Sequence, residues 1–386
     1  MKHRKRRKRE RGLKAPKDPT IYGQWVNAGR PRGGERGAGA GTRGNGRRHT
    51  GGMQLLMDGN NLAWAGFHAL RKAMEAESED EKSRAALLGL TQSVLNLAIR
   101  GGEPPVPGRP QEAAASFTGN PVRGLTVAFD EGRPLRRRTV YPNYQLGRES
   151  NPAFAENEPA VLAAIAQFIE LTAMLPVTVA RGVNTEADDL IACLALGTRE
   201  PVRIASTDRD FLQLVDERLT IYSPVKRVVI GVAEFTAATA PKTADGTPIA
   251  FPRERYLDYR VASGDPSDDL PGIPGVGAVT AARLLAEAPL DAYLDEPALA
   301  AKALGRRNAK LEAALAGDAA REAVARNRVL MDLRLAAKRY DTLDGYLQRG
   351  TWNEAGFRAW VADQRIAGLE VEPAWRILEA LAKAAT

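Results

Sequence analysis

Short apolar segments alternate with helical stretches through residues 53–231, and this alternation limits the fold more than any other feature. The segments "MQLLMD", "GLTVAFD", "PVTVA" and "VRIASTD" read as buried strands, the first followed by a polar turn. Helical patterns separate them at residues 81–100, 158–175 and 181–197, and "LTIYS" and "RVVIG" read as a hairpin. This order predicts a mostly parallel sheet flanked by helices. We therefore expect an α/β domain over residues 53–255.

The chain changes character on both sides of this domain. After residue 255 no convincing strand remains, and Ala-rich helical patterns predict a helical domain over 256–345 and a C-terminal helical segment over 346–386. Residues 1–52 carry 16 Lys and Arg against three acids, whereas the rest carries 39 basic and 44 acidic residues. We expect this Gly/Arg-rich tail to be disordered. It reads either as an arm that binds nucleic acid or as a dispensable extension before Met53.

Composition excludes several classes of protein. A chain with 44% hydrophobic and 26% charged residues is typical of soluble globular proteins. Neither a run of 18 apolar residues nor the apolar part of a signal peptide is present, so no membrane contact is expected. The single cysteine, Cys193, excludes an internal disulfide and a thiolate zinc site.

Carboxylates gather at the predicted strand ends and helix starts. The carboxyl ends of parallel strands meet at one edge of a sheet, so these acids can converge in one site. Like charges raise one another's pKa, and oxygen ligands at this density suit Mg²⁺ or Mn²⁺. Two ions about 4 Å apart can clamp the attacking and leaving oxygens of a phosphodiester. The candidate metal ligands are Asp58, Asp130, Glu186, Asp188, Asp189, Asp208, Asp210, Asp265 and Asp268.

Each acid taken alone also has a structural interpretation. Asp58 would shape a turn, the acids at 186–189 would favour a helix dipole, and Asp208 and Asp210 would cap a helix. Their joint placement favours the metal site. His68 is the only histidine outside the tail, so no Ser/His/Asp or Cys/His arrangement can be built. Water activated by the metal would then be the nucleophile.

Two further stretches suit nucleic acid. "LPGIPGVG" before an Ala-rich helix is typical of a helix–hairpin–helix element, in which Gly272, Gly275 and Gly277 let the backbone approach a phosphate and K⁺ can bridge. An ordinary Pro/Gly turn is the alternative. Residues 133–150 interleave arginines with tyrosines, a pattern that suits a single strand with stacked bases, or else a solvated charge run. The candidate DNA-binding side chains there are Arg136, Arg137, Arg138, Tyr141, Tyr144 and Arg148.

These pieces, in their order over residues 53–290, resemble the metal-dependent 5′-nucleases. That family includes bacteriophage 5′→3′ exonucleases, flap endonucleases and the 5′-nuclease domain of bacterial DNA polymerase I. The most specific pieces are "TEADD", "STDRD" and "GDPSDDLPGIPGVG". The resemblance implies a PIN-like α/β domain, an H3TH helix–hairpin–helix domain and two Mg²⁺ ions. It also implies cleavage at 5′ flaps, nicks or RNA primers in DNA replication or repair.

The resemblance further implies roles for the basic segment. Residues 133–160 would form the arch or clamp that admits the 5′ strand, and Arg137, Arg148 and Tyr144 would act at the scissile phosphate. The family pattern usually has Lys after the second Tyr of this segment, where this chain has Gln145. We expect a monomer in the cytoplasm of a bacterium or phage-infected cell, acting on DNA with a 5′ single-strand/duplex junction or on an RNA–DNA primer. A catalytically impaired DNA-junction-binding paralogue and a PIN-like ribonuclease are the alternatives.

Overall fold

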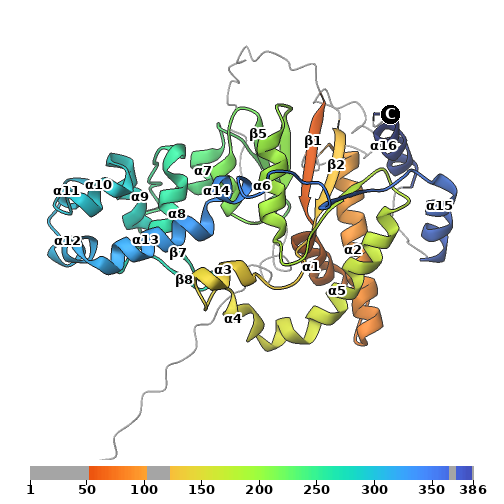
Figure 1. Cartoon of the computed structure of the whole chain (residues 1–386), viewed down its shortest axis with the longest axis horizontal. Coiled ribbons are helices and arrows are strands. Elements are labelled where there is room, and N and C mark those ends of the chain that lie inside the picture. Colours follow the sequence, from red (N-terminus) through yellow and green to blue (C-terminus); the bar gives the residue numbers. More distant parts are fainter. Residues whose placement is uncertain (1–51, 102–121, 365–370, 385–386) are drawn as a thin grey trace, which may run out of the picture. The chain divides into compact units, whose positions relative to one another are not determined.

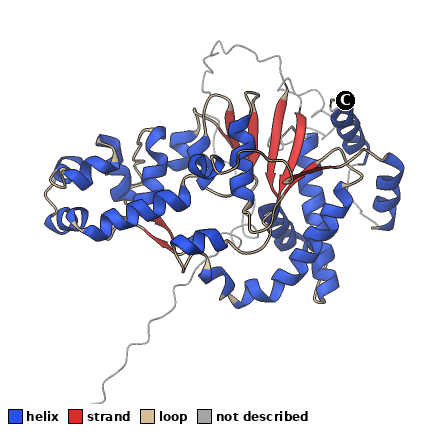
Figure 2. Ribbon diagram, viewed as in Figure 1, coloured by secondary structure: helices blue, strands red, loops and turns tan. Residues whose placement is uncertain are grey.

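A seven-stranded sheet lies at the centre of the computed structural model, which describes residues 52–101, 122–364 and 371–384 (Figures 1 and 2). The strand order is β6-β5-β4-β1-β2-β3-β9; the five strands from β5 to β3 are parallel, and β6 and β9 pair antiparallel at the two edges. The mostly parallel sheet and the hairpin are therefore confirmed. Its strands are β1 (Met53–Asp58), β2 (Val122–Ala128), β3 (Thr178–Ala180), β4 (Val202–Ala205), β5 (Leu219–Ser223), β6 (Val228–Ile230) and β9 (Leu347–Arg349).

Apolar side chains cover both faces of the sheet. Successive strand residues point to opposite sides, so one strand contributes to two apolar cores. In β1, Leu55 and Met57 belong to one apolar core, whereas Leu56 belongs to the other. The first core is completed by α1 (Gly59–Leu70), α2 (Glu79–Ile99), α5 (Pro152–Thr172) and α16 (Val371–Lys383). The second includes α6 (Ala187–Gly197), α7 (Phe235–Thr239), α8 (Tyr256–Ser263) and α14 (Leu333–Ala337). Among the described residues no helix combines the length and hydropathy that a membrane span needs.

Two helices begin earlier than the sequence indicated. Helix α1 starts directly after β1, where the sequence predicted a polar turn, because the Asp58 carboxylate accepts a hydrogen bond from Asn61 N at 3.0 Å and caps the helix. Helix α5 starts at Pro152 rather than at residue 158, with Asn151 as its cap. In both cases a short polar side chain that suits a turn acts as an N-cap instead.

The region after residue 255 is predominantly helical, as predicted. Helix α8 contacts α9 and α13. The loop between α8 and α9 carries two of the predicted metal ligands, Asp265 and Asp268. In this loop β7 (Gly264–Asp265) and β8 (Leu270–Pro271) flank the short 3-10 helix η4 (Pro266–Asp268). The helices that follow are α9 (Ala278–Glu287), α10 (Leu290–Asp295), α11 (Leu299–Leu304), α12 (Ala309–Ala316) and α13 (Asp318–Met331).

The prediction that no strand follows residue 255 is wrong. Besides the β7–β8 pair, β9 joins the main sheet antiparallel to β3, with Gln348 opposite Val179. All three residues of β9, "LQR", are exposed, so they lack the alternation that marks a half-buried strand. The chain then continues through α15 (Glu354–Asp363), and α16 contacts α2 and β2. The predicted 1–52 tail, apart from its last residue, lies outside the described residues.

Candidate active site

Four predicted acids meet at the carboxyl edge of the parallel strands. Asp58 ends β1, Asp130 follows β2, Asp188 lies in the first turn of α6, and Asp208 follows β4. Ser206 connects two of these segments, since its hydroxyl donates to Asp58 Oδ2 at 2.8 Å and accepts from Asp208 N at 3.0 Å. Burial, and then the charges of the other three acids, raise the pKa of Asp188 well above its ordinary value. The four carboxylates thus share one electrostatic environment.

Three more acids form a second group, supplied partly by the loop after α8. Asp210 begins the 3-10 helix η2 (Asp210–Leu214), whereas Asp265 and Asp268 come from the 264–268 segment. One carboxylate oxygen of each lies within 4.8 Å of the others. Asp208 joins the two groups, because its charge contributes to raising the pKa of Asp210 and of Asp268.

Arg260 in α8 holds the second group together. Its Nε donates to Asp210 Oδ1 at 2.8 Å, its other guanidinium arm pairs with Asp265, and the residue is only 8% exposed. Sequence analysis did not identify Arg260. The only available signal was its place on the helix that leads into the acidic loop, and no spacing rule distinguishes it there from a surface arginine.

The pKa values show which carboxylates lack full compensation. Burial, with smaller contributions from neighbouring acids, raises the pKa of Asp58 and of Asp210 to about 7 and that of Asp268 to about 6. Asp265 differs, because Arg260 and hydrogen bonds from Ser267 outweigh burial and lower its pKa. Oxygen ligands that are buried, close together and incompletely paired fit divalent cations.

Glu186 and Asp189 lie beside these groups, but Arg137 neutralises both. One guanidinium arm pairs with Glu186 Oε2, and the other donates to Asp189 Oδ1 at 2.8 Å. Arg137 is 6% exposed, and its Nε donates to Leu330 O at 3.1 Å. All nine predicted acids therefore lie in one region, seven of them in the two carboxylate groups and two in this ion-pair network.

The basic segment folds as two short helices around a turn. Helix α3 (Leu135–Val140) and helix α4 (Leu146–Glu149) are separated by residues 141–145. Pro142 lies just after the end of α3, and proline disfavours a helix that continues through it.

The side chains of this segment differ in how far they can reach a ligand. Tyr144 is 5% exposed, and its hydroxyl lies 3.5 Å from carboxylate oxygens of Glu186 and Asp268. Tyr141 has the Arg326 guanidinium over its ring, 4.8 Å from the centroid. Tyr144 is therefore too buried to stack on a base as predicted, whereas Tyr141 is half-buried with Arg326 over one face of its ring.

The four candidate arginines of the segment differ in their burial and in their ion pairs. Arg138 pairs with Glu149 at 2.6 Å, and Arg148 pairs with Asp268 at 3.0 Å. Arg137 is buried as described above, so a contact between its guanidinium and DNA, as predicted, would require its two acids to release it. Arg136 is exposed. Of the four candidates, Arg136 is the best placed to meet a phosphate without breaking an ion pair.

Gln145 occupies the position where the family pattern has lysine. Its Nε2 donates to Asp268 Oδ1 at 2.9 Å and to the Tyr144 hydroxyl at 3.2 Å. Nearby, Gly147 N donates to Asp269 Oδ2 at 2.6 Å, so the basic segment is anchored on the acidic loop. Asp268 is consequently contacted by both Gln145 and Arg148.

The glycines of the hairpin have different roles. A Cβ on Gly272 would lie 2.3 Å from Ala262 O and 2.6 Å from Gly264 N, so this glycine is needed for packing inside the protein. Internal packing alone therefore explains why residue 272 is a glycine, without the predicted approach to a phosphate. Gly275 and Gly277 are exposed, and a Cβ on either would meet nothing within 4 Å. These two remain open to a ligand before α9.

Residues 53–240 match the family model of the 5′-3′ exonuclease N-terminal resolvase-like domain. Residues 53–240 belong to the 5′-nuclease family. The region that matches ends before the helical part, so the assignment of residues 256–345 as an H3TH domain stays a prediction.

Relatives of this chain include much longer proteins. DNA polymerase I of Mycobacterium bovis is 35% identical over 236 residues, which cover 60% of this chain and 23% of that protein. Thermostable DNA polymerase I of Thermus thermophilus is 31% identical over 239 residues, 61% of this chain and 24% of that protein. This chain thus matches about a quarter of the length of these curated relatives.

Solved structures show the same fold. The bacteriophage T5 D15 flap endonuclease, in a pseudo-enzyme–product complex with DNA and metal ions, aligns with a TM-score of 0.53 at 19% identity. The alignment covers 76% of this chain and 96% of the T5 protein. A T5 5′-exonuclease with bound divalent zinc ions aligns with the same TM-score, identity and coverage. At this identity the likeness concerns the fold.

Proposed function

We propose that this protein is a Mg²⁺-dependent, structure-specific 5′-nuclease that hydrolyses phosphodiesters at 5′ flaps, nicks or RNA primers in DNA replication or repair. The observation that carries the proposal is the meeting of seven carboxylates from the ends of β1, β2 and β4, the start of α6 and the 264–268 loop. Acids so far apart in the chain have no shared structural task at this edge, and the raised pKa values of Asp58, Asp188 and Asp210 indicate buried carboxylates that lack full charge compensation.

We infer one metal ion for each carboxylate group, and the second group brings one oxygen of each of its acids within 4.8 Å of the others. Asp58, Asp130, Asp188 and Asp208 would hold one ion, and Asp210, Asp265 and Asp268 would hold the other, with Glu186 and Asp189 as further ligands once Arg137 moves. When bound, the ions supply Lewis-acid stabilisation of the charge that develops on the phosphodiester oxygens. Mg²⁺ or Mn²⁺ suits a site made entirely of oxygen ligands.

Cationic and neutral donors next to the acids would position the substrate. Arg148 and Arg137 would donate to the scissile phosphate, and the buried Tyr144 hydroxyl would orient the carboxylates of Glu186 and Asp268. Burial raises the pKa of Tyr144 well above its ordinary value, so the hydroxyl keeps its proton. Residues 133–160 would form the clamp for the 5′ strand.

The helical region would bind the duplex. Gly275 and Gly277 lie before α9, where exposed backbone amides can approach a phosphate and K⁺ can bridge. We place the protein in the cytoplasm as a monomer, with DNA carrying a 5′ single-strand/duplex junction, or an RNA–DNA primer, as substrate.

A cleavage assay tests the proposal. Substrates are a 3′-labelled flap, a nicked duplex and single-stranded RNA, each with Mg²⁺ or EDTA, and the variants are Asp208→Asn and, as a control, the exposed Asp363→Asn. We expect flap cleavage that needs metal, survives Asp363→Asn and falls by about three orders of magnitude in Asp208→Asn. Cleavage of the flap by Asp208→Asn at the wild-type rate would refute the metal assignment.

One observation favours a second candidate, a DNA-junction-binding paralogue with impaired chemistry. Gln145 supplies no positive charge where the family pattern has lysine, and it contacts Asp268. If this position limits the rate, Gln145→Lys should cleave the flap about ten times faster than wild type in single-turnover experiments. If the wild-type protein binds flaps without cleaving them and only the Gln145→Lys variant cleaves, the binding role would be established.

A further inference from the structure

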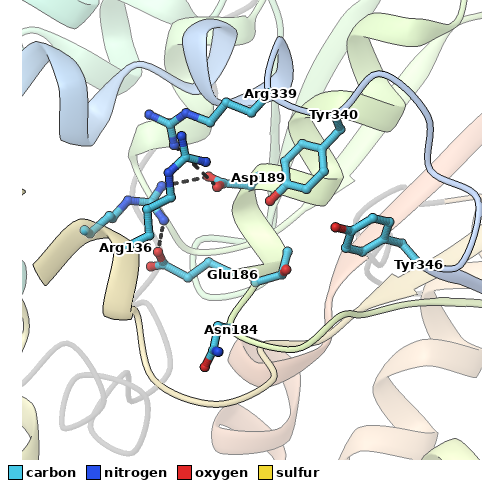
Figure 3. Close-up of a pocket in the computed structure, with 9 residues that line it drawn as sticks. Arg136, Asn184, Glu186, Asp189, Arg339, Tyr340 and Tyr346 are labelled. Atoms are coloured by element: carbon cyan, nitrogen blue, oxygen red, sulfur yellow. Dashed lines mark hydrogen bonds and ion pairs between the residues drawn. The ribbon is translucent and has the colours of Figure 1, made fainter. Parts of the chain in front are cut away.

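A cavity of about 220 Å³ lies next to Arg137 and the two acids that pair with it, Glu186 and Asp189 (Figure 3). Three segments line it: the start of α3, the turn between β3 and α6, and the connection from α14 to β9. The last of these brings Arg339, Tyr340 and Tyr346 to the cavity. None of the roles proposed above uses these three residues.

The lining consists largely of hydrogen-bond donors. Figure 3 shows the hydroxyls of Tyr340 and Tyr346 directed toward the middle of the site, with Arg339 beside Asp189. Thr185 is hydrogen-bonded to Tyr340, and burial, followed by the charge of Asp189, raises the Tyr340 pKa to about 12, so that hydroxyl remains a donor. Tyr346 has room because Gly182 has no side chain: a Cβ there would lie 2.5 Å from the Tyr346 ring.

The acceptors of the cavity are already engaged. Glu186 and Asp189 point their carboxylates at Arg137, which pairs with both. Arg339 is 3.8 Å from Asp189, and its pKa is lowered by burial and then by the charge of Arg136. Arg136 and Arg339 both line the cavity, so their positive charges together favour an anion there.

We propose that this cavity binds a phosphate group of the substrate strand, held by Arg136, Arg339 and the hydroxyls of Tyr340 and Tyr346. Guanidinium groups pair with phosphate oxygens in two-point contacts, and phenol hydroxyls complete the donor set. The proposal rests on the proposed function, which supplies a nucleic-acid strand next to the acids. The phosphate is either the terminal 5′-phosphate or an internal phosphodiester of that strand.

Binding without cleavage separates this site from the catalytic chemistry. The affinity of the full chain for 3′-labelled flaps carrying a 5′-phosphate or a 5′-hydroxyl is measured by fluorescence anisotropy in EDTA. The variants are Arg136→Gln and Tyr346→Phe, and the control is Arg376→Gln, which removes the same charge from an exposed position on α16. Thermal unfolding of each variant checks that the fold is kept.

The two sources of phosphate give different results. If the terminal phosphate occupies the cavity, wild type prefers the 5′-phosphorylated flap by about tenfold, and Arg136→Gln and Tyr346→Phe reduce that preference. If an internal phosphodiester occupies it, both variants weaken binding of both flaps equally, by about tenfold for Arg136→Gln, while Arg376→Gln does not. Wild-type affinity of both variants for both flaps would overturn the proposal.

The outcomes also separate this proposal from the proposed function. Weaker binding by Arg136→Gln, together with an absence of Mg²⁺-dependent cleavage by wild type, would keep the phosphate site and reject the nuclease. Mg²⁺-dependent flap cleavage by wild type, with unchanged binding in both cavity variants, would keep the nuclease and reject the phosphate site.

Discussion

At the scale of single residues, Arg260 is the side chain on which the second carboxylate group depends. It is buried and pairs with Asp210 and Asp265 at once. Replacing one partner of a buried ion pair leaves the others uncompensated, so we expect Arg260→Gln to lower the free energy of unfolding by about 3 kcal/mol. Urea unfolding in EDTA at pH 8 measures this effect.

Arg321→Gln is the matched control for that measurement. Arg321 pairs with Asp295, and the two side chains are 51% and 74% exposed. Water screens such a pair, so its loss should change the free energy of unfolding by less than about 1 kcal/mol. Equal effects of the two substitutions would show that Arg260 does not hold the acidic group together.

The raised pKa values of the acids predict an unusual pH dependence of stability. The pKa of Asp58 and of Asp210 is about 7 in the folded protein, against 3.8 for an unperturbed aspartate. Between these values the native state binds more protons than the unfolded state, so the free energy of unfolding falls as pH rises. In EDTA, Tm should decrease from pH 5.5 to pH 7.5, and less so in Asp58→Asn. A Tm that is constant or rises over this interval would contradict the assigned environment.

At the scale of elements, the loop between α8 and α9 combines a packing role with an exposed surface. Gly272→Ala should destabilise the protein, because the new Cβ would meet Ala262 O at 2.3 Å. Gly277→Ala should leave Tm unchanged, since a Cβ there meets nothing within 4 Å, but should weaken duplex binding if this backbone contacts phosphate. Differential scanning fluorimetry and duplex titration distinguish the two. Equal Tm losses would refute the division of roles.

The elements also show what the sequence could predict. Apolar segments such as β1 and β4 were identifiable because burial on both faces requires hydrophobic side chains. Strand β9 was not, because it is exposed and its pairing with β3 uses backbone groups that every residue has. Likewise, seven of the nine acids were marked by their positions at strand ends or at a helix start, whereas Arg260 and Arg339 act through contacts that only the folded chain creates.

At the scale of the whole molecule, charge is divided unevenly along the sequence. Residues 1–52 carry a net charge of +13, and the rest of the chain carries −5. If the tail contacts DNA, a chain that starts at Met53 should bind flaps more weakly at low salt and with a shallower slope of log affinity against log salt. An unchanged slope would identify the tail as dispensable.

The central claim is that acids from five segments of the chain form one metal centre. Anomalous diffraction from crystals grown with Mn²⁺ tests it most directly. We predict two peaks per chain, one within coordinating distance of Asp58 and Asp188, the other within coordinating distance of Asp210 and Asp268. Crystals saturated with Mn²⁺ that show no peak at these carboxylates would contradict the account.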